Sequence, residues 1–125
     1  MQTETFDRIV TVDPGISAVV VRNIPGTLPI FATHFPRFPL YPGVLLLDTI
    51  AAASALAAGL GECWELREAR GLRWRAPVRP GDCVEIQVTA VTDAWRAIVT
   101  VDGRKVASAD RIEVGPTEIS TGGTL

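Results

Sequence analysis

The sequence predicts an α+β fold in which an antiparallel sheet wraps around one long central helix. The first observation is the run from Val44 to Leu60, which has a single charge, Asp48, and is dominated by strong helix formers such as Leu and Ala. The second is that β-branched, strand-like segments precede and follow this run. A helix that is apolar on every face must be wrapped by other structure, and a curled sheet of half-apolar strands can wrap it.

Length and composition indicate one globular domain. The chain has 125 residues, of which 47% are hydrophobic, and its formal net charge is −2. A chain of this size buries a core without splitting into domains, and without a basic run we expect no nucleic-acid partner. Cys63 and Cys83 stand far apart with no CxxC motif. We therefore expect no disulfide framework, no metal site, and a reducing, cytoplasmic location.

The first part of the chain predicts a β-hairpin followed by a long loop. Residues 8–12 and 16–22 are rich in β-branched side chains, and Asp13-Pro14-Gly15 between them is a turn sequence. Residues 23–42 contain five prolines and no helical period. They predict a loop that carries His34 toward the helix.

The apolar run predicts a buried helix and not a membrane span. It is shorter than the roughly 20 apolar residues that a span needs, and Asp48 lies inside it. Its internal position and the lack of a basic leader argue against a signal peptide. Gly59-Leu60-Gly61 supplies the residues that stop the helix.

The second half of the chain predicts antiparallel strands joined by short turns. The strand-like segments cover residues 66–76, 83–92, 95–101 and 104–114, separated by Pro80-Gly81-Asp82, Thr92-Asp93-Ala94 and Asp102-Gly103. The last of these turns predicts a tight hairpin. We therefore expect a single domain over residues 1–114 and a flexible C-terminal tail over residues 115–125, which are rich in Gly, Thr and Ser.

The start of the helix has features of an anion-binding site. Pro42 fits the first helical position and Tyr41 cannot cap the helix, so the N–H of Gly43 lacks an obvious side-chain partner. Water, a neighbouring loop or a polarised ligand oxygen could accept from it. His34, the only histidine, and Asp48 flank this end. A base, an acid and an oxyanion donor are what proton abstraction beside a carbonyl requires, although each residue alone could be structural.

Two motifs resemble those of a known enzyme family. The first comprises His34-Phe35-Pro36, Pro39, Pro42-Gly43-Val44-Leu45 and Asp48, and the second is residues 71–82, GLRWRAPVRPGD. They resemble the active-site segment and a later strand and turn of the 3-hydroxyacyl-[acyl-carrier-protein] dehydratases, which have the hot-dog fold. The resemblance covers residues 22–113.

The resemblance implies dehydration of 3-hydroxyacyl thioesters on acyl carrier protein to trans-2-enoyl thioesters, in fatty-acid, polyketide or polyene biosynthesis, without a cofactor. In that family His34 would take the C2 proton and the Gly43 N–H would stabilise the enolate oxygen. Asp48 would help the C3 hydroxyl leave, and we expect burial to raise its pKa. The implied substrate-binding residues are Phe35, Pro42, Val44, Ala51, Ala52 and Trp74, with Ala55 on the same small face. The implied carrier contacts are Arg37, Arg73, Arg75 and Arg79.

The resemblance also implies at least a homodimer, in which His34 of one subunit meets Asp48 of the other. Hot-dog proteins associate through their sheets. The strand with Trp95, Ile98 and Val99, or an edge strand nearby, is a candidate for the interface.

Three residues depart from the family pattern. Asp48 stands where the commoner branch has Glu and matches the dehydratase-isomerase branch, Ala52 replaces a Gln found in many dehydratases, and Arg37 replaces a frequent Gly. Two other functions therefore stay open: a hot-dog acyl thioesterase that activates water, and a non-catalytic or partner-dependent subunit that binds carrier-bound acyl chains. The alanines could equally serve close packing, the arginines a solvated surface, and Trp74 the core.

Overall fold

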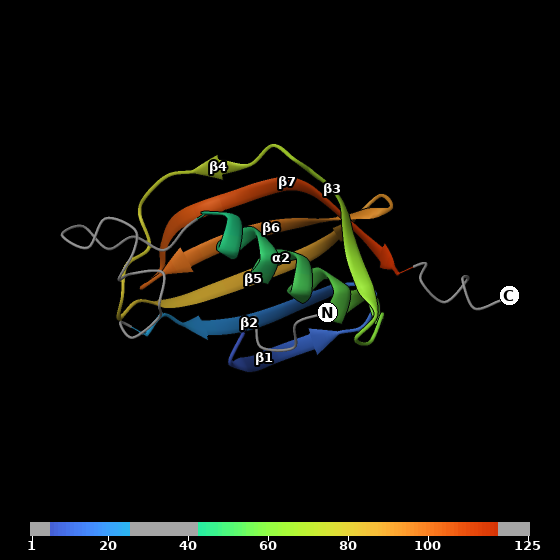
Figure 1. The fold of residues 1–125 in the computed structure, drawn as a ribbon, viewed down its shortest axis with the longest axis horizontal. Coiled ribbons are helices and arrows are strands. Elements are labelled where there is room, and N and C mark those ends of the chain that lie inside the picture. Colours follow the sequence, from blue (N-terminus) through green and yellow to red (C-terminus); the bar gives the residue numbers. More distant parts are fainter. Residues whose placement is uncertain (1–5, 26–42, 118–125) are drawn as a thin grey trace, which may run out of the picture.

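The computed structural model of the chain describes residues 6–25 and 43–117, which form a seven-stranded antiparallel sheet wrapped around one helix (Figure 1). In chain order the elements are β1 (Arg8–Asp13), β2 (Ser17–Asn23), α2 (Gly43–Ala58), β3 (Trp64–Arg70), β4 (Arg73–Trp74), β5 (Cys83–Val91), β6 (Ala94–Val101) and β7 (Arg104–Pro116). Hydrogen bonds join the strands in the order β1-β2-β5-β6-β7-β3, and β4 also pairs with β7. The predicted α+β fold is confirmed.

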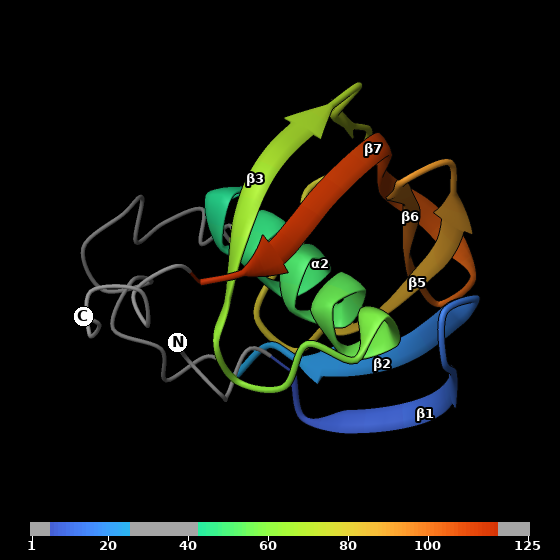
Figure 2. The same cartoon turned by 90° about the vertical axis from the view of Figure 1, so that its right-hand side faces the viewer.

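The main core lies between α2 and the hollow face of the curved sheet (Figure 2). α2 packs against β2, β5 and β7. Along β5 the side chains of Val84, Ile86 and Val88 are fully buried, whereas the residues between them are exposed. This alternation is the period of two expected of a sheet with one covered face. Each fully buried aliphatic side chain contributes about 1.5–3 kcal/mol of transfer free energy.

The C-terminus of α2 is closed by a Schellman motif. Gly59 has a φ of 74°, and its N–H donates to the carbonyl of Leu56 at 3.1 Å. The N–H of Leu60 donates to the carbonyl of Ala55, also at 3.1 Å. These two bonds satisfy carbonyls that the helix leaves unpaired, and glycine adopts the left-handed conformation without a Cβ penalty. The predicted stop at residues 59–61 is therefore confirmed.

Two polar side chains inside α2 are buried without cost to the apolar core. The hydroxyl of Thr49 donates to the carbonyl of Leu45 at 3.2 Å, and that of Ser54 donates to Ile50 at 3.0 Å. Both residues are almost completely buried. Because each hydroxyl bonds back to the carbonyl four residues earlier, neither leaves an unsatisfied donor in the core.

The strand predicted over residues 66–76 is two strands, β3 and β4, which both pair with β7. The interruption falls at Gly71, which has a φ of 67°. A Cβ at this position would overlap the carboxyl group of Asp110 on β7. The absence of a side chain at Gly71 therefore lets the chain pass close to Asp110 between the two strands.

Gly71→Ala should destabilise the protein more than Gly81→Ala does. Both glycines have positive φ, at 67° and 91°, but only Gly71 faces another residue, because nothing lies within 4 Å of a Cβ at Gly81. Gly81→Ala should cost about 1–2 kcal/mol of conformational strain. Gly71→Ala adds the displacement of Asp110. Urea denaturation of both variants measures the difference, and equal losses would show that Asp110 moves aside freely.

The free edges of the described sheet are β1 on one side and, on the other, β3 and β4, which both pair with β7. β6, which carries Trp95, Ile98 and Val99, lies between β5 and β7. It therefore offers no free edge to a second copy of the chain. Any edge-to-edge association of the described strands must use β1, β3 or β4.

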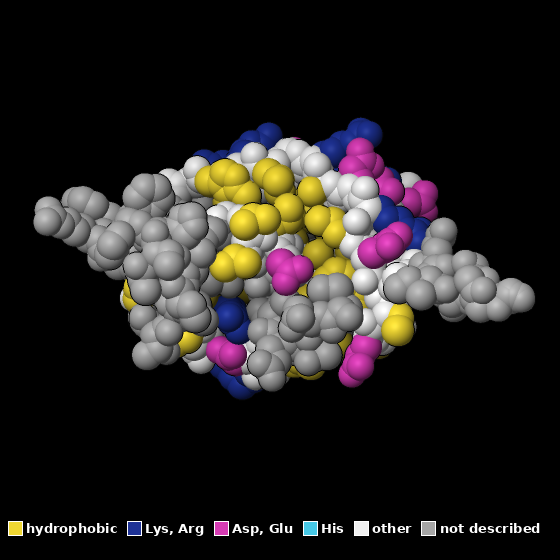
Figure 3. Space-filling view, viewed as in Figure 1, with side chains coloured by type: hydrophobic (Ala, Val, Ile, Leu, Met, Phe, Trp, Pro, Cys, Tyr) yellow, Lys and Arg dark blue, Asp and Glu magenta, His cyan; other side chains and the backbone are white. Residues whose placement is uncertain are grey.

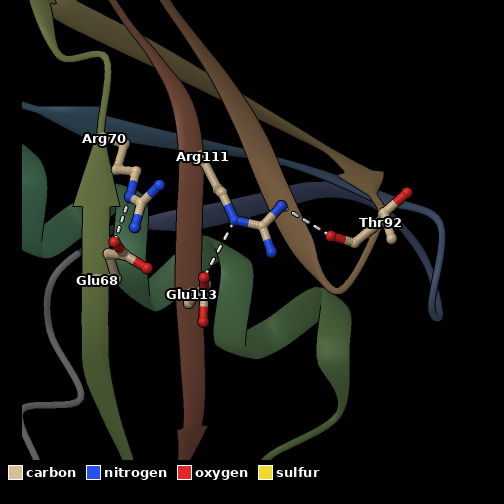
Figure 4. A network of polar contacts seen from close by, with 5 residues as sticks. All are labelled: Glu68, Arg70, Thr92, Arg111 and Glu113. Atoms are coloured by element: carbon tan, nitrogen blue, oxygen red, sulfur yellow. Dashed lines mark hydrogen bonds and ion pairs between the residues drawn. The ribbon is translucent and has the colours of Figure 1, made fainter.

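Paired charges cover the outer face of the sheet beside the β3 edge (Figure 4). Glu68 stands opposite Glu113, and Arg70 stands opposite Arg111. Each of these four charges is offset by an opposite charge on its own strand. On β3 Arg70 donates to Glu68, and on β7 the Nε of Arg111 donates to Glu113 at 3.0 Å. Arg111 also donates to the carbonyl of Thr92 at 2.8 Å. The hydrogen bond from Arg111 lowers the pKa of Glu113.

The remaining elements agree closely with the sequence. Asp102 and Gly103 both have positive φ between paired Val101 and Arg104, as a two-residue hairpin of type I′ requires. β7 continues through Pro116, so Gly115 and Pro116, placed in the tail by sequence, extend the sheet. No helix in the described ranges combines the length and the hydropathy needed to cross a bilayer.

Candidate active site

Asp48 lies in the second turn of α2, on a face that is open at its first end. Val44, Asp48, Ala52 and Ala55 follow one another at helical spacing, so their side chains share one side of the helix. In the first turn Val44 is 71% exposed and Leu45 37% exposed. The expectation that the helix is buried on every face is wrong for this turn. Asp48 sits where the open part of the face becomes covered.

The carboxyl group of Asp48 is partly buried. Burial raises its pKa above the ordinary value of an aspartate. Within the described residues no cation or hydrogen-bond donor pairs with the group. Desolvation therefore acts unopposed there, in the predicted direction. A carboxyl group of raised pKa is protonated for more of the time at a given pH, as a proton donor must be.

The N-terminus of α2 lies against the indole of Trp74. A Cβ on Gly43 would lie 3.3 Å from Cε2 and Cζ2 of Trp74, so the ring lies directly beside the first residue of the helix. Trp74 is 50% exposed, so it is not a core residue. Val44, Leu45 and Trp74 are thus exposed apolar residues near the start of α2. Figure 3 shows hydrophobic side chains gathered over α2 and β4.

The alanine face of α2 is covered by a residue that the sequence analysis missed. Ala51, Ala52 and Ala55 are buried in one cluster with Trp64, the first residue of β3. Ala51 and Ala52 had been expected to contact substrate, and the described chain fills the space beside them with an indole. The large apolar side chain of Trp64, shortly after the helix stop, was the available signal.

The predicted carrier contacts on the second motif are not equivalent. Nη1 of Arg73 lies 3.0 Å from Oδ1 of Asp110, and both side chains are exposed. The ion pair offsets the positive charge of Arg73, which the sequence could not show because Asp110 lies on β7. Arg75 and Arg79 are exposed and form no side-chain ion pair among the described residues. Among these three arginines, the positive charges of Arg75 and Arg79 are therefore less offset than that of Arg73.

Several predicted site residues lie outside the described residues: His34, Phe35, Arg37 and Pro42. The meeting of His34 with Asp48 therefore stays a prediction. In residues 6–25 and 43–117 no group of three His, Cys, Asp or Glu side chains is arranged to hold a metal ion.

Comparison with solved structures defines the class of the protein first. The fold matches the dehydratase heterocomplex ApeI:P from Xenorhabdus doucetiae with a TM-score of 0.68 and 20% identity, over 79% of this chain and 87% of that chain. Together with the sheet order and the single wrapped helix, the match establishes the hot-dog fold.

Comparison of sequences then identifies the family. A model of the ApeI-like family, described as ApeI dehydratase, matches residues 12–110. The 3-hydroxyacyl-[acyl-carrier-protein] dehydratase FabZ of Anaeromyxobacter sp. (strain Fw109-5) is 38% identical over 118 residues, which cover 83% of this chain and 75% of the relative. FabZ of Myxococcus xanthus is 34% identical over 116 residues, covering 83% and 76%. The chain belongs to the ApeI-like dehydratase family and is a dehydratase, a lyase.

Proposed function

We propose that this dehydratase removes water from 3-hydroxyacyl thioesters on acyl carrier protein and forms trans-2-enoyl thioesters, in fatty-acid or polyketide biosynthesis. The observation that carries the proposal is Asp48, a partly buried carboxyl group of raised pKa at the inner end of an open helix face. The names of the relatives at 34% and 38% identity support the substrate class.

The chemistry assigns one task to each of three groups. His34 takes the proton from C2, and the charge passes to the thioester oxygen, where the N–H of Gly43 donates to it. The C3–O bond then breaks, the C2–C3 double bond forms, and Asp48 gives a proton to the departing oxygen, which leaves as water. A positioned acid or base contributes about 10²–10⁴-fold. One oxyanion donor contributes about 2.7–4 kcal/mol.

The working unit is proposed to be a homodimer that brings His34 of one subunit to Asp48 of the other. The open turn of α2 supports this, because an exposed Val44 and Leu45 beside a half-exposed Trp74 is an apolar surface that a second chain can cover. Arg75 and Arg79, with Arg37, are proposed to meet the phosphate of the pantetheine arm or the acidic carrier. Arg73 should contribute less, because Asp110 offsets its charge.

An assay with two thioesters tests the proposed function. The purified protein should convert a 3-hydroxyacyl thioester to an enoyl thioester, detected by absorbance, and should leave an unsubstituted acyl thioester intact. Release of thiol from the unsubstituted substrate would identify a thioesterase. If neither substrate reacted, while both bound, the chain would be a binding subunit and the proposal would fail.

A further inference from the structure

The helix face that carries Asp48 is open on one side of this residue and closed on the other. On the N-terminal side of Asp48 this face is formed by Val44, whose side chain is exposed. After it come Ala52 and Ala55, which are almost completely buried. An alanine side chain projects only one carbon from the helix backbone, which leaves room above this face for a larger side chain from another element.

The side chain that fills this space is Trp64. It is 7% exposed and is the only large member among the buried residues of its cluster, which otherwise contains alanines. The half-buried residues around it are Phe6, Leu60 and Val114. Trp64 begins β3 shortly after the helix stop, and its indole is buried in the same cluster as Ala51, Ala52 and Ala55 of α2. Its position is held by pairing with Pro116 on β7.

We propose that Trp64 sets the upper limit on the length of the acyl chain that this enzyme accepts. The inference rests on the proposed function, in which the thioester reacts beside Asp48 and the acyl chain extends along the alanine face. With a rise of about 1.5 Å per residue, Ala52 lies about 6 Å and Ala55 about 10 Å beyond Asp48 along the helix axis. A chain extending along this face meets the indole within that distance. The preferred substrates are therefore short, and longer chains require the indole to move.

Trp64→Leu and Trp64→Ala test the limit, with Trp95→Leu as the matched control. Trp95 is 8% exposed, nearly as buried as Trp64, but it belongs to the main core and not to the alanine cluster. The probes are S-alkyl pantetheine thioethers with butyl, hexyl, octyl and decyl chains, which bind without reacting, measured by isothermal titration calorimetry. The same variants are assayed with 3-hydroxybutyryl to 3-hydroxydecanoyl thioesters. Circular dichroism confirms that each variant is folded.

In the Trp64 variants the ratio of decyl to butyl affinity should rise at least about tenfold over wild type, as expected when space for several methylenes opens. The ratio should stay unchanged in Trp95→Leu. An unchanged ratio in folded Trp64→Leu would overturn the inference and show that the indole only packs the core, even if dehydration proceeds. A raised ratio in a protein that dehydrates no substrate would uphold the limit and reject the proposed function instead.

Discussion

Asp48→Asn should lower kcat for dehydration by about 10²–10⁴-fold, because the amide cannot donate the proton that the departing C3 oxygen needs. KM should change little, since the amide has nearly the shape of the carboxyl group and the loss falls on the transition state. Steady-state kinetics with a 3-hydroxyacyl thioester measure both parameters. Asp93→Asn is the control, because Asp93 is an exposed turn residue whose φ of 59° asparagine also adopts.

The same substitution should stabilise the fold at neutral pH. Burial raises the pKa of Asp48, so the folded state holds its proton more tightly than the unfolded chain does. The stability associated with the protonated group is complete below the ordinary aspartate pKa and is lost as pH rises through the raised one. Asparagine does not ionise and avoids this loss. The melting temperature of Asp48→Asn should therefore exceed that of wild type at neutral pH.

The pH dependence distinguishes this effect from a general gain in packing. The difference in melting temperature between Asp48→Asn and wild type should shrink toward zero below about pH 4, where the carboxyl group is protonated in both states. Asp93→Asn should show no such trend. A variant less stable than wild type at neutral pH would mean that the Asp48 carboxylate is stabilised in the fold, against the proposed acid role.

Local signals in the sequence were sufficient for most of the fold. The apolar run gave the helix to within two residues at its C-terminal end, because Gly59 supports a local Schellman motif. Asp102-Gly103 likewise specified its hairpin through backbone preferences of two adjacent residues. The break at Gly71 could not be predicted in this way. It depends on Asp110, which lies far along the chain and meets Gly71 only when β7 is in register.

The position of Asp48 on the helix was predictable from the sequence, and the surroundings of Asp48 were less so. Asp48 lies where the motif predicted, and its pKa shifts in the predicted direction. The apolar composition of the helix could not distinguish burial by its own sheet from an apolar surface left open, so the exposure of Val44 was not predicted. The small alanine face could not indicate whether substrate or Trp64 fills it, because that depends on where β3 starts.

Mixing of two inactive variants would test most directly the claim that one active site draws its groups from two subunits. His34→Ala and Asp48→Asn are each expected to abolish dehydration. In a mixed dimer carrying one chain of each kind, one of the two sites would combine an intact His34 with an intact Asp48. Mixed dimers isolated through two different affinity tags should therefore recover about half of the wild-type activity per dimer, as two-fold symmetry requires.

A dimer of wild-type chain with the double variant His34→Ala/Asp48→Asn is the matched control. It contains the same number of altered residues, but each shared site would have one defect, so it should be inactive. If His34 and Asp48 instead acted within one chain, the results would be reversed. Inactive mixed dimers beside a half-active control would contradict the account.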